Sequence, residues 1–130
     1  MKEASGNFEQ CMRIIKNKPK DFYVISGDDN ITLPLIASGA DGVISVVANG
    51  FPKDFSEMVR QALAGNITQA QKLHYKTFEI TEQLFADGNP GGIKIALEAL
   101  KICQSYVRLP LVKPNAKVQK RIIELVAEYK

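Results

Sequence analysis

The sequence predicts an α/β fold in which parallel strands occupy the first 50 residues and helices occupy the rest. Two apolar runs, FYVIS (22–26) and GVISVVAN (42–49), show no alternation of apolar and polar residues. Strands of that kind are expected to be buried on both faces, as in parallel sheets covered by helices. A helical pattern precedes each run, which gives right-handed βαβ units. From Pro52 onward the patterns are helical only.

The first helix is predicted between Asn7 and Pro19. Asn7, with Gln10 three residues later, has the pattern of a helix N-terminus. The helix is expected to end near Lys18, because the residue before a proline avoids the helical region. One face of this helix carries Phe8, Cys11, Met12 and Ile15. The residues around Lys2 are then the end of a preceding strand, in register with the two apolar runs.

A second helix is expected from about Ile31 to Ser38, between the two apolar runs. The first run ends at Gly27, and three polar residues follow it. We expect Asp29 or Asn30 to cap the helix, a contribution of about 1 kcal/mol for one good cap. Asp28 would then face a pocket at the strand ends.

Four more helices are predicted after residue 50. The first has one apolar face, formed by Phe55, Met58, Val59, Ala62 and Leu63. Asn66, with Gln69 after it, is expected to cap a long helix that runs to about Ala86. A helix over 93–100 is apolar nearly all round and is expected to be buried. Asn115 opens the last helix, with Val118, Ile122, Leu125 and Val126 on one face.

Composition narrows the class of protein. The chain has 130 residues, of which 45% are hydrophobic, enough for one domain with a core. Its formal charge is +3, with acids among the basic residues. The densest basic group is Lys113, Lys117, Lys120 and Arg121. We interpret it as a solvated helix face, since a nucleic-acid surface needs clustered charge with stacking aromatics.

Neither a membrane span nor a metal site is predicted. No apolar run approaches the length of a transmembrane helix. Cys11 and Cys103 lie far apart in sequence and lack zinc spacing, so we expect two reduced, buried thiols and a cytoplasmic protein. His74 is the only histidine. It lies within the long helix, without a partner for a triad, and is interpreted as structural.

Lys2 is the residue with the clearest chemical potential. A lysine in this position is usually a solvated surface residue. Here, however, it is predicted at the carboxyl end of a parallel strand, where α/β barrels hold their catalytic groups. An apolar surrounding penalises the ammonium form, and the free amine can then attack a carbonyl.

Several motifs, taken together, resemble those of a known family. KEASG (2–6), SGDD (26–29) and GVISVVAN (42–49) occur in the order and spacing of the dihydrodipicolinate synthase / N-acetylneuraminate lyase family of pyruvate-dependent class I aldolases. Asn89-Pro90 followed by Lys94, and RLPL (108–111), resemble its C-terminal helical region. The resemblance covers essentially the whole chain, and the first and last of the three strand-end motifs favour the synthase branch.

The resemblance implies the C-terminal part of a TIM (β/α)8 barrel followed by a helical region. Residues 1–50 would hold the end of strand 6 with strands 7 and 8, and residues 51–130 the last barrel helix and the C-terminal helices. Lys2 matches the lysine that forms a Schiff base with pyruvate, and Ile44 the position whose backbone contacts pyruvate. Positions that line the same cavity are Gly27, Asp28 and Val46. No cofactor or metal is implied.

The implied activity is the condensation of pyruvate with aspartate semialdehyde in lysine biosynthesis. The implied protein is a homo-oligomer (dimer or tetramer), and neither nucleic acid nor a membrane is expected as a partner. The family's Gly-rich carboxylate-binding loop, relay tyrosine and substrate-binding arginine have no match in the sequence, so the chain alone is expected to be inactive. An open sheet of three strands also leaves both edges unpaired. Two alternatives remain: another pyruvate-dependent aldolase, such as a neuraminate or sugar-acid lyase, and a non-catalytic half-barrel that self-associates.

Overall fold

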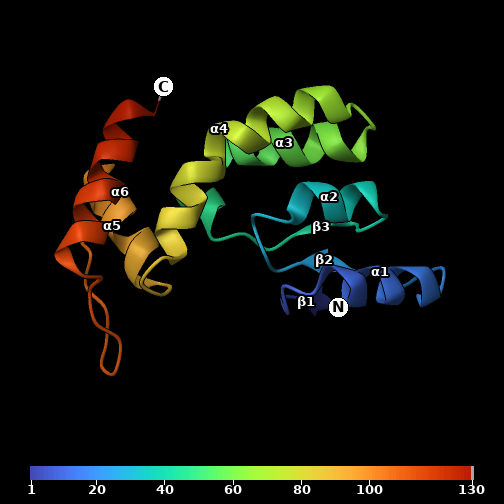
Figure 1. Cartoon of the computed structure of the whole chain (residues 1–130), viewed down its shortest axis with the longest axis horizontal. Coiled ribbons are helices and arrows are strands. Elements are labelled where there is room, and N and C mark those ends of the chain that lie inside the picture. Colours follow the sequence, from blue (N-terminus) through green and yellow to red (C-terminus); the bar gives the residue numbers. More distant parts are fainter. Residues whose placement is uncertain (130) are drawn as a thin grey trace.

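The structure is a computed structural model that describes residues 1–129. It begins with a parallel sheet and its connecting helices and ends with a group of helices (Figure 1). The strands are β1 (Lys2–Glu3), β2 (Ile25–Ser26) and β3 (Gly42–Val43). The helices are α1 (Phe8–Asn17), α2 (Thr32–Ala37), a 3₁₀ helix η1 (Val47–Asn49), α3 (Pro52–Leu63), α4 (Ile67–Phe85), α5 (Gly91–Ala99) and α6 (Ala116–Glu128).

The sheet confirms the predicted parallel order. β2 lies between β1 and β3, and Lys2 pairs with Ile25, which in turn pairs with Gly42. The strands are shorter than the apolar runs that predicted them. The prediction of a strand over the whole of 42–49 is wrong, because β3 ends at Val43 and the chain then turns into η1. The physical reason is a buried carboxylate that binds the backbone of this turn, described with the site below.

Only one face of the sheet is covered. Glu3 and Ser26 are buried on the side of the helices, where Cys11 of α1 and Thr32 of α2 donate hydrogen bonds to them. The opposite face is open, and the Ile44 side chain just beyond β3 is 57% exposed. The expectation that both faces are buried is therefore wrong for residues 1–129, because their helices pack against one face.

The two short helices between the strands begin in different ways. Asn7 caps α1 as predicted, because its side chain accepts a 3.0 Å hydrogen bond from the Gln10 N–H. The expected cap of α2 is wrong. Its N-cap residue is Ile31, which has no side-chain cap hydrogen bond. The Asp29 carboxylate instead binds the backbone beyond β3.

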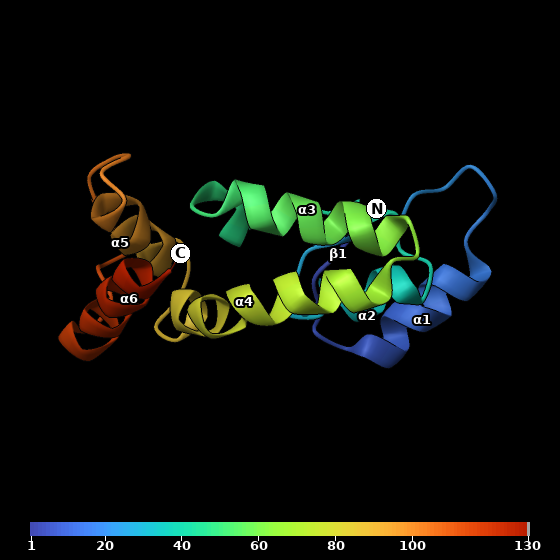
Figure 2. The same cartoon turned by 90° about the horizontal axis from the view of Figure 1, so that it is seen from above.

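α3 and α4 form an antiparallel pair that lies over α2 and β3 (Figures 1 and 2). Phe55, Met58 and Leu84 are fully buried where these helices meet the rest of the core. Gly65 has a φ of 79°, which suits the turn between them. Asn66 is the N-cap residue of α4, as predicted, but its side chain makes no capping hydrogen bond, and its amide donates to the Gln61 side chain at 2.9 Å.

α5 and α6 pack together at the other end of α4. α5 is largely buried, as its composition predicts. A Cβ at Gly92 would lie 2.1 Å from the Leu84 carbonyl oxygen, so this glycine permits the close approach of α4 and α5. Asn115 caps α6 as predicted and accepts hydrogen bonds from Lys117 N–H and Val118 N–H, both at 3.1 Å.

The two cysteines differ in their surroundings. Cys11 is buried and free, as expected, whereas Cys103 is free and exposed in the segment after α5, so the expectation of burial is wrong there. In Figure 1 the segment between α5 and α6 projects away from the body of the molecule. None of the helices described over residues 1–129 has the length and apolar character to span a membrane.

Candidate functional site

The register of the sheet brings the carboxyl ends of three strands to one edge. The Gly27 N–H donates to the Glu3 carbonyl at 2.6 Å, and the Ile44 N–H donates to the Ser26 carbonyl at 2.9 Å. Lys2, Gly27 and Ile44 therefore belong to neighbouring strands at the same end of the sheet. Functional groups in parallel α/β folds gather at this end of the strands.

Lys2 lies close to Gly27. A Cβ at position 27 would be 2.6 Å from the Lys2 Cε, 2.6 Å from the Ala4 Cβ and 3.0 Å from the Glu3 carbonyl oxygen. Only glycine leaves room for the lysine stem in this position. Lys2 itself is exposed on the open face of the sheet.

Glu3 lies on the opposite face of the same strand and is held there by three hydrogen bonds. The Cys11 thiol donates to one carboxylate oxygen at 2.7 Å, and the Ser5 N–H and Gln10 amide donate to the other at 3.1 and 3.2 Å. These donors lower the pKa of Glu3. Burial and the adjacent carboxylate raise the pKa of Cys11 to about 11, so this thiol is no nucleophile at neutral pH. Because side chains alternate along a strand, anchoring Glu3 to α1 directs Lys2 to the open face.

Asp28 lies beside Gly27 at the same edge. Its Oδ1 accepts a 3.1 Å hydrogen bond from the Asn30 N–H, and its carbonyl accepts one from the Thr32 hydroxyl at 2.7 Å. The carboxylate thus shapes the turn after β2 and remains only partly buried.

Asp29 connects the ends of two strands. Its Oδ2 accepts hydrogen bonds from the Val46 N–H at 3.0 Å and the Val47 N–H at 3.1 Å. Only 3% of the residue is exposed, and burial raises the pKa of the Asp29 carboxyl against the opposing effect of the Ser45 hydroxyl and the two amides. Sequence reasoning missed this contact. Its only signal was a second carboxylate directly after the strand-end glycine.

The predicted site residues are thus divided into two groups. Lys2, Gly27, Asp28 and Ile44 meet at one edge of the sheet. Val46 lies two residues farther along, in the turn whose backbone Asp29 binds. An adjoining groove of about 490 Å³ runs between β3 and α3. The residues that line this groove are Ile25, Asp41, Gly42, Val43, Ser45, Ala48, Phe55, Ser56, Val59, Arg60 and Leu63.

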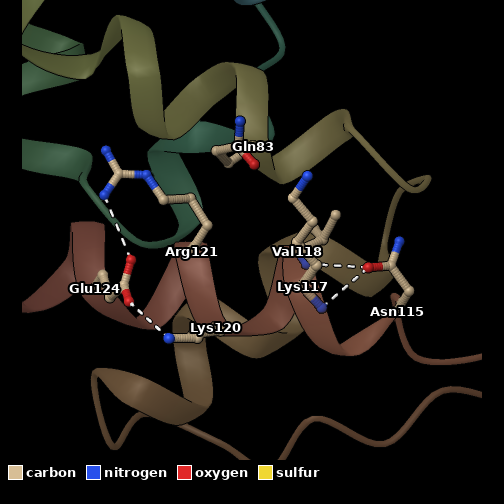
Figure 3. A pocket seen from close by; sticks show the side chains of 7 residues that line it. All are labelled: Gln83, Asn115, Lys117, Val118, Lys120, Arg121 and Glu124. Carbon is tan, nitrogen blue, oxygen red and sulfur yellow. Dashed lines mark hydrogen bonds and ion pairs between the residues drawn. The ribbon is translucent and has the colours of Figure 1, made fainter.

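A second hollow, of about 510 Å³, lies between α4 and α6 (Figure 3). Its lining comprises Gln83, Asn115, Lys117, Val118, Lys120, Arg121 and Glu124. Arg121 pairs with Glu79 and, at 3.5 Å, with Glu124, which also lies 3.9 Å from the Lys120 Nζ. Acidic partners thus offset part of the basic character of α6, as expected for a solvated helix face. This helix lies at the opposite end of the molecule from α1 (Figures 1 and 2).

The side chains described over residues 1–129 do not form a candidate metal site. Over residues 1–129, no three His, Cys, Asp or Glu side chains are arranged to hold a metal ion. His74 is nearly buried in α4, with its ring edge-on to Tyr75 and Phe78, and burial lowers its pKa. These contacts support the structural interpretation of this histidine.

The parallel βαβαβ arrangement with helices after it defines part of an α/β barrel and its C-terminal helical region. The model of the Dihydrodipicolinate synthetase family matches residues 1–129. The chain therefore belongs to this family, and the resemblance of its strand-end motifs is confirmed.

Individual relatives agree with the family match. A 4-hydroxy-tetrahydrodipicolinate synthase of Phocaeicola vulgatus is 48% identical over 130 residues, which is 100% of this chain and 44% of that protein. The synthase of Flavobacterium psychrophilum is 48% identical over 94% of this chain and 42% of its own length. The crystal structure of dihydrodipicolinate synthase from Aquifex aeolicus superposes with a TM-score of 0.94 at 36% identity, over 98% of this chain and 44% of that one. The chain thus spans less than half the length of these relatives.

Proposed function

We propose that this chain carries the Schiff-base strand of a 4-hydroxy-tetrahydrodipicolinate synthase, which condenses pyruvate with aspartate semialdehyde in lysine biosynthesis. The observation that carries the proposal is the place of Lys2, at the end of a parallel strand with its stem packed against Gly27. The relatives described above carry the synthase name, which favours this activity over that of a neuraminate or sugar-acid lyase.

In the proposed mechanism, the Lys2 amine attacks the ketone of pyruvate and water leaves, which forms an imine. The imine withdraws electrons, so the pyruvate methyl group loses a proton and the resulting enamine forms a carbon–carbon bond with the aldehyde. Ile44 contacts pyruvate through its backbone, and Gly27, Asp28 and Val46 line the cavity. No metal or cofactor takes part.

The amine reacts only in its unprotonated form, which an apolar surrounding favours. Lys2 is exposed over residues 1–129, and the face it occupies is open. We therefore propose that further barrel strands must cover this face, and that the chain alone has little or no synthase activity. The proposed boundary lies near residue 50, between barrel strands and C-terminal helices, and the complete protein is proposed to be a cytoplasmic homo-oligomer.

The test is reductive trapping with pyruvate and borohydride, followed by intact and peptide mass spectrometry. It uses the 130-residue chain and a full-length fusion in which this chain replaces the matching 44% of the Phocaeicola vulgatus synthase. We expect an adduct on the peptide that carries Lys2 in the fusion, and turnover with aspartate semialdehyde. The matched variants are Lys2→Arg, which should lose the adduct, and Lys20→Arg, which should keep it. Failure of the fusion to form an adduct on Lys2 would overturn the proposal.

A further inference from the structure

Asp29 makes an unusual connection between two strand ends. A single carboxylate oxygen accepts hydrogen bonds from two consecutive backbone N–H groups, those of Val46 and Val47. Hydrogen bonds to an ionised acceptor are stronger than those between neutral groups. The turn after β2 is therefore fixed to the turn after β3, although Asp29 and Val46 are 17 positions apart in the sequence.

The burial of Asp29 indicates that its contact with the turn after β3 has a functional role as well as a structural one. The residue is 3% exposed, and its other oxygen, Oδ1, accepts no well-formed hydrogen bond within residues 1–129, although the nearby Ser45 hydroxyl acts to lower the pKa of the carboxyl. A buried carboxylate oxygen without a partner is unfavourable for stability. Ionisable groups whose pKa is shifted by burial are found preferentially at functional sites, and burial raises the pKa of Asp29. The Asp29 side chain also plays no part in capping α2, whose N-cap residue Ile31 has no side-chain cap bond.

The hydrogen bonds of Asp29 hold the segment that directly follows Ile44. β3 ends at Val43, the Ile44 N–H makes the last hydrogen bond to β2, and the chain then turns into η1. With the amides of Val46 and Val47 held by Asp29, the backbone between Ile44 and Val46 has both ends fixed. The carbonyl of Ile44 lies in this fixed segment, at the same sheet edge as Lys2.

We propose that Asp29 is a positioning residue of the pyruvate site, which fixes the backbone at Ile44 for contact with the pyruvate imine on Lys2 by binding the amides of Val46 and Val47. This inference rests on the proposed function and deepens it. Asp29 itself touches neither pyruvate nor the reacting atoms. Its effect passes through the turn, so its loss should impair the recognition of pyruvate more than the later chemical steps.

The test compares Asp29→Ala with Asp41→Ala in the full-length fusion described above. Asp41 is the matched control, because its carboxylate also accepts a backbone N–H, that of Val24 at 2.8 Å, but at the opposite end of β3. Alanine is used because asparagine would keep an oxygen that can accept the same N–H groups. We expect Asp29→Ala to lower kcat/KM for pyruvate about 100-fold, the size of effect that a misplacement of about 1 Å produces. The loss should fall mainly on KM. A merely structural role would reduce the active fraction, which lowers kcat and leaves KM unchanged.

Amide hydrogen exchange of the fusion, measured by NMR, provides the second readout. In Asp29→Ala the amides of Val46 and Val47 should lose more protection than those of α3 and α4. In Asp41→Ala the protection of Val46 and Val47 relative to α3 and α4 should stay as in the wild type. Protected amides of Val46 and Val47 in Asp29→Ala, or lost protection with an unchanged KM for pyruvate, would overturn the inference. A wild-type fusion without an adduct on Lys2 would instead contradict the proposed function itself.

A second variant tests the same contact if Asp29→Ala does not fold. Val46→Pro removes one of the two N–H donors and leaves the carboxylate intact, and the φ of −83° at Val46 is close to what proline requires. We expect it to raise KM for pyruvate as Asp29→Ala does, by a smaller factor. A folded Val46→Pro variant with the KM of the wild type would overturn the inference.

Discussion

The strand region and the helical region of this chain are held together in different ways. In the helical region, large side chains such as Phe55, Met58 and Ile122 are fully buried between helices. In the strand region each strand has two residues, one face is open, and buried carboxylates join neighbouring segments. The comparison indicates that apolar packing stabilises the helices, whereas a few polar contacts determine the geometry of the strand ends. Substitutions should therefore affect stability in one region and the site in the other.

The largest loss of stability is expected in the helical core. Phe55→Ala removes a fully buried ring from α3 and should lower the free energy of unfolding by about 3 to 5 kcal/mol. Leu63→Ala on the same helix is the control, since Leu63 is 53% exposed, and should change it by less than about 0.5 kcal/mol. Urea denaturation followed by circular dichroism measures both. Similar losses for the two variants would show that α3 does not anchor the core.

The largest effect on the site is expected at Gly27. In Gly27→Ala the new Cβ would lie 2.6 Å from the Lys2 Cε, so the lysine stem must move. We expect trapping of pyruvate by the full-length fusion to fall about 100-fold, and the free energy of unfolding to fall by about 1 to 3 kcal/mol. Gly50→Ala is the control, because its nearest contact would be 3.3 Å, to Leu100. Undiminished trapping in Gly27→Ala would contradict the packing of Lys2 against Gly27.

A smaller, pH-dependent effect is expected at the amino end of β3. The Asp41 carboxylate accepts hydrogen bonds from the Lys18 amine and the Val24 N–H, and these two donors lower its pKa. A lowered pKa in the folded state stabilises the protein above the unfolded value of about 3.9, and that contribution is lost as the pH falls through the folded pKa. Asp41→Asn should therefore cost about 1 to 2 kcal/mol at neutral pH and progressively less below about pH 4.

Urea denaturation at a series of pH values measures this difference. Asp21→Asn, at an exposed position in the connection between α1 and β2, is the matched control and should change the free energy of unfolding by less than about 0.5 kcal/mol. A difference between wild type and Asp41→Asn that stays constant from pH 7 to low pH would contradict the role of the charged carboxylate.

The sequence predicted the helices better than the strands, for a physical reason. Helical periodicity reports contacts within one segment, so α3, α4 and α6 lie close to their expected ranges. The run over 42–49 has the apolar content of a strand, yet β3 ends at Val43 because a carboxylate from another loop binds the turn beyond it. Local propensity carries no signal for a contact made across 17 residues.

The same distinction applies to the candidate site. Lys2, Gly27 and Ile44 could be placed together from the sequence, because the order of parallel strands and the family motifs place them at one edge. The role of Asp29 was missed, because capping a nearby helix and binding a distant backbone require the same residue type. The apolar runs predicted strands buried on both faces, whereas one face is open, since apolar content predicts burial without showing which segment provides it.

The smallest effect on stability is expected at the C-terminal end of α6, where a polar contact lies within the helical region. The Tyr129 hydroxyl donates to the Asp54 carboxylate at 2.7 Å, and burial together with this carboxylate raises the pKa of Tyr129. Tyr129→Phe keeps the ring contact with Phe51 and should lower the free energy of unfolding by about 1 kcal/mol. Tyr106→Phe, at a side chain that is 71% exposed, should leave it unchanged. This polar contact lies in the helical region, so its loss should not change the trapping of pyruvate at Lys2 in the full-length fusion. Reduced trapping would show that the two regions are coupled.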